Sequence, residues 1–232
     1  MEGSKGGHAT SGERTTSEGH ATSGYYRDEF GQIARFYDFG IRTLFKWIGG
    51  EAAFRHGIIE AAELSEGHRV LDVSCGTGTL ADMMAGRVGP GGRVMGIDLS
   101  EEMLKVARRK ATSDNLDFIR ANAEDLPFED DSLDRATISL AVHEMNREGR
   151  LNVLSEMHRV LAPGGLAAVA DMRPPDTWFA RLGMRMVGLV ETETLTDMWQ
   201  SGLFKEMGSA GFTDRRRRIA ARGFFEIVVG RK

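Results

Sequence analysis

The sequence predicts an α/β fold in which a mostly parallel sheet is covered by helices on both faces. Apolar, strand-like runs alternate with helical stretches between residues 69 and 171, and a glycine-rich turn joins the first run to a helix. Two further strand-like runs adjoin at the C-terminus. Apolar strands separated by helices are typical of parallel sheets with both faces buried. Five alternating runs and two terminal ones predict seven strands.

Residues 1–24 lack the material for a core. They are mostly Gly, Ser, Thr, His or charged, and the hexapeptide GHATSG occurs at 7–12 and again at 19–24. Such a segment buries too little apolar surface to offset the entropy lost on ordering, so we expect a disordered low-complexity tail. Residues 25–66 then carry apolar side chains at helical spacing, which predicts an N-terminal helical cover ending with a helix from Glu51 to Leu64.

Residues 67–232 are expected to form the main domain. Its first five strands are predicted at 69–74, 93–98, 116–120, 133–140 and 166–171, with helices beginning after Gly78, Ser100 and Arg147. The last helix presents an apolar stripe, and Pro163-Gly164-Gly165 is expected to end it.

Two features complete this domain. Residues 176–210 are predicted to form a helical insertion after the fifth strand. Residues 214–223 and 224–230 are predicted to pair as an antiparallel hairpin that turns at Gly223.

Composition excludes several classes of protein. Hydrophobic residues make up 41% and charged residues 28%, as in a globular domain with a core, and the net charge of -4 disfavours a duplex nucleic-acid binder. No apolar run approaches the ~20 residues that span a bilayer, and no signal segment opens the chain, so we expect a cytoplasmic protein. The single cysteine, Cys75, excludes an intramolecular disulfide, and the scattered histidines indicate no metal site.

The strongest local signal is the run VLDVSCGTGTLA at residues 70–81, in which a strand leads through a glycine loop into a helix. Gly76 and Gly78 allow a sharp turn and a close approach of backbone amides to a ligand. Asp98 ends the second strand, where a carboxylate can accept both hydroxyls of a ribose. Together these residues predict an adenosine-containing cofactor across the carboxyl ends of the first two strands.

A dinucleotide is the alternative cofactor, because Gly76-x-Gly78-x-x-Ala81 also fits that fingerprint. Two features disfavour it. Asp72 stands four residues before the first glycine, where a carboxylate suits a cationic amino group better than a pyrophosphate. The chain also ends in a hairpin where a second nucleotide-binding half would be expected. A purely structural glycine turn is a further alternative.

Four motifs now amount to a family resemblance. The runs VLDVSCGTGTLA, GIDLSEEMLKVAR, ANAEDLPF and HRVLAPGGLAAVAD resemble the class I S-adenosylmethionine-dependent methyltransferases, which have a Rossmann-like fold. Within this class the sequence is most similar to the ubiquinone/menaquinone C-methyltransferase family. The resemblance covers residues 69–171 well and 210–232 more loosely.

The resemblance implies a contact for each part of S-adenosylmethionine. The implied residues are Asp72, Gly76, Thr77 and Gly78 at the methionine end, Asp98 at the ribose, Asn122 and Ala123 at the adenine, and Ser139 at a further contact position. Many relatives have Asp in place of Asn122, but an amide oxygen also accepts a hydrogen bond from the adenine amine. Ser139 has the alternative role of packing.

His143, just past the fourth strand, is the candidate catalytic residue. A histidine changes charge near neutral pH, so it suits removal of a proton from an acceptor hydroxyl, and Glu144 is its neighbour. The alternative is a loop histidine that only shapes the pocket. The sequence departs from the quinone family here, since the usual tetrapeptide glycine-leucine-arginine-asparagine is absent.

The acceptor is expected to be a small or lipid-like molecule bound by segments outside the core sheet. Its predicted walls are Tyr25, Tyr26, Phe30, Phe36 and Tyr37 on one side and Trp178, Phe179, Leu182, Met184, Met186, Val187 and Leu189 on the other, with plain core packing as the alternative. The basic run at residues 215–218 suggests peripheral contact with anionic lipid, or else a charged edge strand.

The activity predicted in this way is methyl transfer, with C-methylation of a quinol as the first hypothesis. Alternatives are an N- or O-methyltransferase for another small molecule, such as a phospholipid head group, and a non-catalytic cofactor-binding subunit. The sequence leaves the oligomeric state open.

Overall fold

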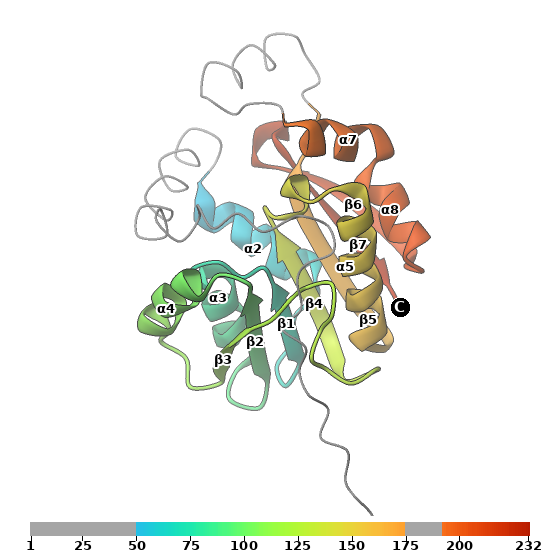
Figure 1. Cartoon of the computed structure of the whole chain (residues 1–232). Coiled ribbons are helices and arrows are strands. Elements are labelled where there is room, and N and C mark those ends of the chain that lie inside the picture. Colours follow the sequence, from blue (N-terminus) through green and yellow to red (C-terminus); the bar gives the residue numbers. More distant parts are fainter. Residues whose placement is uncertain (1–49, 175–191) are drawn as a thin grey trace, which may run out of the picture.

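A computed structural model describes residues 50–174 and 192–232. Seven strands form one sheet in the order β3-β2-β1-β4-β5-β7-β6 (Figure 1). The strands are β1 (Arg69–Val73), β2 (Arg93–Asp98), β3 (Leu116–Arg120), β4 (Leu133–Ser139), β5 (Leu161–Met172), β6 (Thr213–Ala220) and β7 (Phe225–Arg231). The first five strands pair in parallel, whereas β7 pairs antiparallel with both β5 and β6. The predicted mostly parallel sheet with a terminal hairpin is therefore confirmed.

Helices cover both faces of this sheet (Figure 1). They are α2 (Glu51–Ala61), α3 (Thr79–Val88), α4 (Glu101–Lys110), α5 (Arg147–Val160), α7 (Glu193–Ser201) and α8 (Leu203–Ser209), with short 3-10 turns η1 (Val142–Glu144) and η2 (Ala221–Gly223). Gly57 of α2 lies over Ile227, while Gly230 lies under Met207 of α8. Positions 227 and 230 of β7 point to opposite faces, so α2 and α8 cover opposite sides.

The helix starts follow local capping chemistry. Ser100 Oγ accepts a hydrogen bond from the amide of Met103 at the start of α4, and Asn146 does the same for Gly149 at the start of α5. Each uncapped amide of a first turn needs such a partner, which is why both helices begin beside a short polar side chain. The predicted starts after Gly78 and Ser100 match α3 and α4, and α5 begins at Arg147 itself.

The end of α5 differs from the prediction. The helix stops at Val160, and β5 begins at Leu161, ahead of the Pro163-Gly164-Gly165 turn that was expected to end it. Leu161 pairs with Leu133, and the register then shifts before the regular part of β5. The Pro163-Gly164-Gly165 turn thus lies within the first part of β5, because Leu161 already pairs with Leu133 of β4 before the turn.

The strand order places the candidate site. β1 lies between β2 and β4. The chain first adds β2 and β3 on one side of β1 and then crosses over to add β4 on the other side, which makes β1 a switch point of the sheet. In open α/β sheets, ligands bind outside the carboxyl ends of the strands at such a switch point. The loop after β1, the end of β2 and the loop after β4 all lie at this edge.

Several sequence expectations fall outside the described residues: the tail 1–24, the segment 25–49 and the acceptor-wall residues between 175 and 191. The described part of the expected cover contains α2, whose Phe54, Ile58 and Ile59 are buried in the same core as the strands. The described part of the expected insertion contains α7 and α8. Over residues 50–174 and 192–232, no helix has both the length and the apolar character needed to cross a bilayer.

Candidate functional site

The glycine loop after β1 turns tightly against its neighbours. Gly76 has a φ of 54° and Gly78 a φ of 74°, both in the left-handed region. A Cβ on Gly78 would lie 2.7 Å from Phe118 Cζ and 2.9 Å from Ala107 Cβ. Gly78 is therefore required by backbone conformation and by packing, whereas a Cβ on Gly76 would have no described atom within 4 Å. The space at Gly76 leaves its backbone open to close approach.

Asp98 joins the end of β2 to this loop. Its Oδ2 accepts a hydrogen bond from the Gly76 amide at 2.9 Å, and its Oδ1 accepts one from the Ser100 amide at 2.9 Å. Burial raises the pKa of Asp98, and the backbone hydrogen bonds partly oppose that rise. A carboxylate has about four acceptor positions, so capacity remains for a further donor.

Asp72 lies in β1, four residues before Gly76, and is 1% exposed. Its Oδ1 accepts a hydrogen bond from Thr137 Oγ1 at 2.7 Å. Its Oδ2 is buried and has no hydrogen-bond partner within the described parts of the chain. Burial raises the pKa of Asp72 to about 7, although the Thr137 hydroxyl and the Arg55 charge act in the opposite direction. An unsatisfied buried carboxylate oxygen is costly, so it marks a place where a ligand donor would be stabilised.

Ala123 and Asp98 line one small recess at the end of β2. The recess is formed by Ser74, Ile97, Asp98, Leu99, Ala121 and Ala123. Asn122 occupies the turn beside it, where its Oδ1 accepts a hydrogen bond from the Glu124 amide at 3.0 Å. The structure thus brings the predicted ribose and adenine residues together, with the Asn122 side chain also stabilising its own turn.

Thr77 and Ser139 lie at the loop and at the end of β4. The Thr77 hydroxyl accepts a hydrogen bond from Lys110 Nζ at 3.2 Å, and Thr77 is 3% exposed. A ligand contact at Thr77 would therefore come through its backbone. Ser139 is the half-buried last residue of β4 and pairs with Ala170 of β5.

His143 forms a bonded pair with Asp171, the residue next to the end of β5. The His143 Nδ1 lies 2.8 Å from Asp171 Oδ1, and the His143 amide donates to Asp171 Oδ2 at 3.2 Å. The Met172 amide also donates to Asp171 Oδ1 at 2.7 Å. Two backbone donors identify this carboxyl as an acceptor, so Nδ1 carries the imidazole proton and Nε2 is the basic nitrogen. Nε2 lies 3.7 Å from Glu144 Oε1.

The charges around His143 favour its protonated form. Burial by itself lowers the pKa of His143, but the Asp171 charge and hydrogen bond, with the Glu144 charge, outweigh burial. The pKa of His143 consequently lies above its ordinary value of 6.5. A base of this kind matches proton removal from a weakly acidic hydroxyl near neutral pH.

Sequence reasoning missed Asp171 and Thr137. Asp171 ends the predicted strand LAAVAD, and a carboxylate that follows five apolar residues at a strand end is a usable signal. Thr137 has no comparable signal, because a threonine within a strand is unremarkable for β-structure. Only its pairing opposite Asp72 reveals its role.

Comparisons with known proteins agree with this geometry. A family described as methyltransferase domain matches residues 70–165. An uncharacterized methyltransferase from Synechocystis sp. is 33% identical over 185 residues, which cover 79% of this chain and 85% of that protein. The chain belongs to the S-adenosylmethionine-dependent methyltransferases.

This methyltransferase resembles two further proteins. The demethylmenaquinone methyltransferase of Listeria monocytogenes is 42% identical over 126 residues, so the match spans 53% of this chain and 52% of that protein. A solved S-adenosylmethionine-dependent methyltransferase from Aquifex aeolicus matches with a TM-score of 0.62 at 22% identity, covering 82% of this chain and 97% of that one. The likeness to this solved structure shows the class I fold. The cofactor, S-adenosylmethionine, follows from membership of the family.

Proposed function

We propose that this methyltransferase transfers a methyl group to the ring carbon of a quinol, with His143 as the general base. The observation that carries the proposal is the His143–Asp171 pair at 2.8 Å beside the switch point of the sheet. The 42% identity to a demethylmenaquinone methyltransferase over about half of each chain supports the quinol as acceptor.

The residues around the glycine loop fit the cofactor. Asp72 Oδ2, which lacks a partner among the described residues, is the acceptor that an ammonium group at the methionine end requires. Asp98 keeps acceptor capacity for a ribose hydroxyl, and apolar residues line most of the recess beside Ala123, as an adenine ring requires. The loop at Gly76, Thr77 and Gly78 would supply backbone contacts, and Ser139 would bound the site from β4. When bound, the cofactor supplies a methyl group on a positively charged sulfur.

The chain's own contribution is alignment and proton removal. Methyl transfer is an in-line displacement, so the acceptor carbon must lie opposite the leaving sulfur with water excluded. His143 Nε2 takes the proton of the acceptor hydroxyl, which makes the ring carbon nucleophilic. The cofactor, held at Asp72 and Asp98, would supply the methyl group to that carbon with its sulfur as the leaving group. The ring carbon would then release its proton, and the His143 imidazolium would return a proton to the ring oxygen. Asp171 holds the imidazole and stabilises its charged form.

A second candidate is O-methylation of a phenol. The same base would serve a phenol oxygen, and the quinone-family tetrapeptide is absent beside His143. The two activities share every step up to proton removal and differ in the atom that is aligned with the methyl group.

A labelled methyl-transfer assay tests the proposal. The full-length protein is incubated with methyl-labelled cofactor and, in separate reactions, a demethylated quinol, a simple phenol or phosphatidylethanolamine vesicles. We expect label in the quinol, with mass spectrometry and NMR placing the methyl group on carbon. Label only on phenol oxygen or on the phospholipid would refute quinol C-methylation, and no transfer to any acceptor would favour a non-catalytic subunit. His143→Gln should lower turnover at least about tenfold while cofactor affinity is retained.

A further inference from the structure

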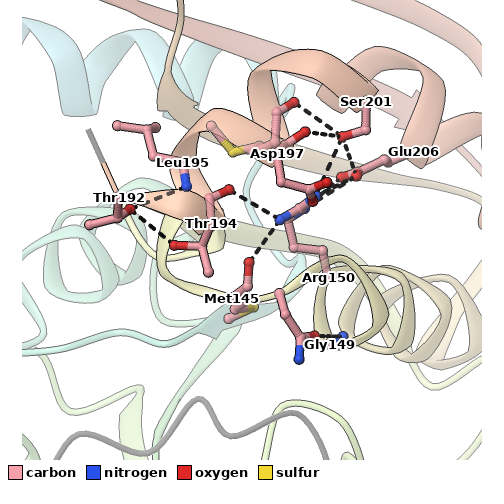
Figure 2. A network of polar contacts seen from close by, with 11 residues as sticks. Met145, Gly149, Arg150, Thr192, Thr194, Leu195, Asp197, Ser201 and Glu206 are labelled. Carbon is pink, nitrogen blue, oxygen red and sulfur yellow. Dashed lines mark hydrogen bonds and ion pairs between the residues drawn. The ribbon is translucent and has the colours of Figure 1, made fainter.

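Arg150, in the first turn of α5, is completely buried and links four segments (Figure 2). Its Nε and Nη2 donate to the two oxygens of Glu206 at 2.9 and 2.8 Å. Nη2 also pairs with Asp197 of α7, and Nη1 donates to the Met145 carbonyl at 2.7 Å. Glu206 is 2% exposed and accepts a further hydrogen bond from Ser201 at 2.6 Å.

The Met145 contact lies directly beside the proposed base. Met145 follows η1, the single turn that carries His143, and its amide donates to the Val142 carbonyl at 3.2 Å. Arg150 fixes the Met145 carbonyl from the other side. The turn that presents His143 is thereby held between its own hydrogen bond and the buried guanidinium.

Helix α7 makes a second bond to the other half of the pair. Trp199 Nε1 donates to the Met172 carbonyl at 3.1 Å, and Met172 directly follows Asp171. Asp197 on the same helix pairs with Arg150. One helix is therefore bonded, directly or through Arg150, to the segment carrying His143 and to the segment carrying Asp171.

The chemistry of the cluster indicates that it fixes the geometry of its partners more than it adds stability. A buried ion pair contributes little net stability compared with apolar residues of the same size, because desolvation opposes the attraction. What the guanidinium provides is a rigid fork of donors with fixed angles. Here the fork places the Met145 carbonyl relative to α7, and the indole places the Met172 carbonyl relative to the same helix.

We propose that Arg150 and Trp199 are positioning residues, and that α7 acts as a brace that keeps the His143 imidazole in contact with the Asp171 carboxylate. The inference rests on the proposed role of His143. The charged groups that face His143 are Asp171 and Glu144. Neither Arg150 nor Trp199 touches the reacting atoms in this scheme. Each acts through the segment to which it is bonded.

The sharpest test is Trp199→Phe, which removes the indole donor and keeps an aromatic ring. We expect turnover to fall about fivefold to tenfold, the cofactor Kd to stay within about twofold, and the pH midpoint of kcat/KM to move down toward 6.5, the ordinary value for histidine. Arg150→Lys keeps a charge but loses the fork, so its midpoint should move the same way. Phe204→Leu is the matched control, because the Phe204 ring on α8 packs under Arg215 of β6 and makes none of these bonds.

NMR titration of His143 separates this inference from the proposed function. The imidazole is observed directly in the full chain, without acceptor, in the wild type, in Trp199→Phe, in Arg150→Lys and in Phe204→Leu. A midpoint that is lowered in Trp199→Phe and unchanged in Phe204→Leu supports the brace, even if His143→Gln proves fully active. An unchanged midpoint in both Trp199→Phe and Arg150→Lys, with both proteins folded, overturns it.

Discussion

The Thr137 hydroxyl donates to Asp72 Oδ1 at 2.7 Å and leaves Oδ2 of the same carboxyl buried without a partner among the described residues. Thr137 therefore supplies a hydrogen bond to only one oxygen of a carboxyl group that is buried away from water. A carboxylate in this state destabilises the protein without its ligand and favours a cationic ligand. The Asp72 carboxylate should therefore increase the affinity for the cofactor and decrease the stability of the protein without it.

Replacing Asp72 separates these two effects. The folded state raises the pKa of Asp72 from 3.8 to about 7, so the unfolded chain releases this proton first as pH rises. The resulting loss of stability grows between about pH 4 and pH 7 and is complete above pH 7. Asp72→Asn should raise the free energy of unfolding by about 2 kcal/mol near pH 8 and by much less near pH 4, measured by urea denaturation. It should also weaken cofactor binding at least about tenfold by calorimetry. A variant that is less stable at both pH values would contradict this account.

Cofactor affinity in the wild type should depend on pH through the same group. Only the ionised carboxylate attracts an ammonium, so the Kd should increase as pH falls below about 7, approaching tenfold per pH unit. Thr137→Val is the matched variant, because the Thr137 hydroxyl lowers the pKa of Asp72. Its midpoint should therefore lie higher than that of the wild type. Calorimetric titrations between about pH 5 and pH 8 measure both, and a flat profile would exclude Asp72 from cofactor binding.

Much of the fold follows from local pattern. The β3 bounds, Leu116–Arg120, coincide with the predicted strand, because Leu116, Phe118 and Ile119 supply apolar side chains between the polar residues Asn115 and Arg120. The start of β5 was harder to predict from the sequence. Proline and two glycines after an amphipathic helix usually mark its end, and only the pairing of Leu161 with Leu133 reveals that a strand has already begun.

The residues of the site likewise include some that the sequence predicts and others that it does not. Asp98 and the glycines are predictable because strand, loop and helix follow one another in the sequence. Arg150 is not, since an arginine within a helical pattern indicates a solvent-facing position, and its partners Asp197 and Glu206 lie on other helices. Asp171 similarly gains its meaning from His143, 28 residues away.

The two glycines of the loop should tolerate substitution differently. Gly78→Ala combines a φ of 74° with contacts of 2.7 Å to Phe118 and 2.9 Å to Ala107. It should lower the free energy of unfolding by about 3 kcal/mol. Gly76→Ala, with no described atom near its Cβ, should cost about 1 kcal/mol and act mainly on cofactor affinity. Phe118→Leu should partly rescue Gly78→Ala, because the closest atom is the ring Cζ. Equal losses for both glycines would show that packing does not distinguish them.

The arginine run on β6 should bind anionic membranes only weakly. Arg216 pairs with Glu63 at 2.8 Å and Arg218 with Glu60 at 3.1 Å, so two of its charges face carboxylates of the α2 region. Removing these two carboxylates should leave the charges of Arg216 and Arg218 free to contact anionic lipid. We expect Glu60→Gln combined with Glu63→Gln to strengthen binding to phosphatidylserine vesicles about thirtyfold in sedimentation assays, at about 1 kcal/mol for each of the two arginines. Neutral phosphatidylcholine vesicles are the control, and equal binding to both vesicle types would exclude an electrostatic contact.

Asp171→Asn should change both the rate and its pH dependence. The Asp171 charge and hydrogen bond raise the pKa of His143 above 6.5, so an uncharged amide should lower the pH at which kcat/KM reaches half its maximum. Turnover should fall about tenfold or more, because the amide no longer stabilises the imidazolium formed when His143 takes a proton. Glu144→Gln is the control. Its charge contributes less to the pKa of His143 and lies 3.7 Å from Nε2, so it should shift the midpoint less and leave turnover nearly unchanged. A midpoint that rises in Asp171→Asn would show that the group titrating in the rate profile is not His143.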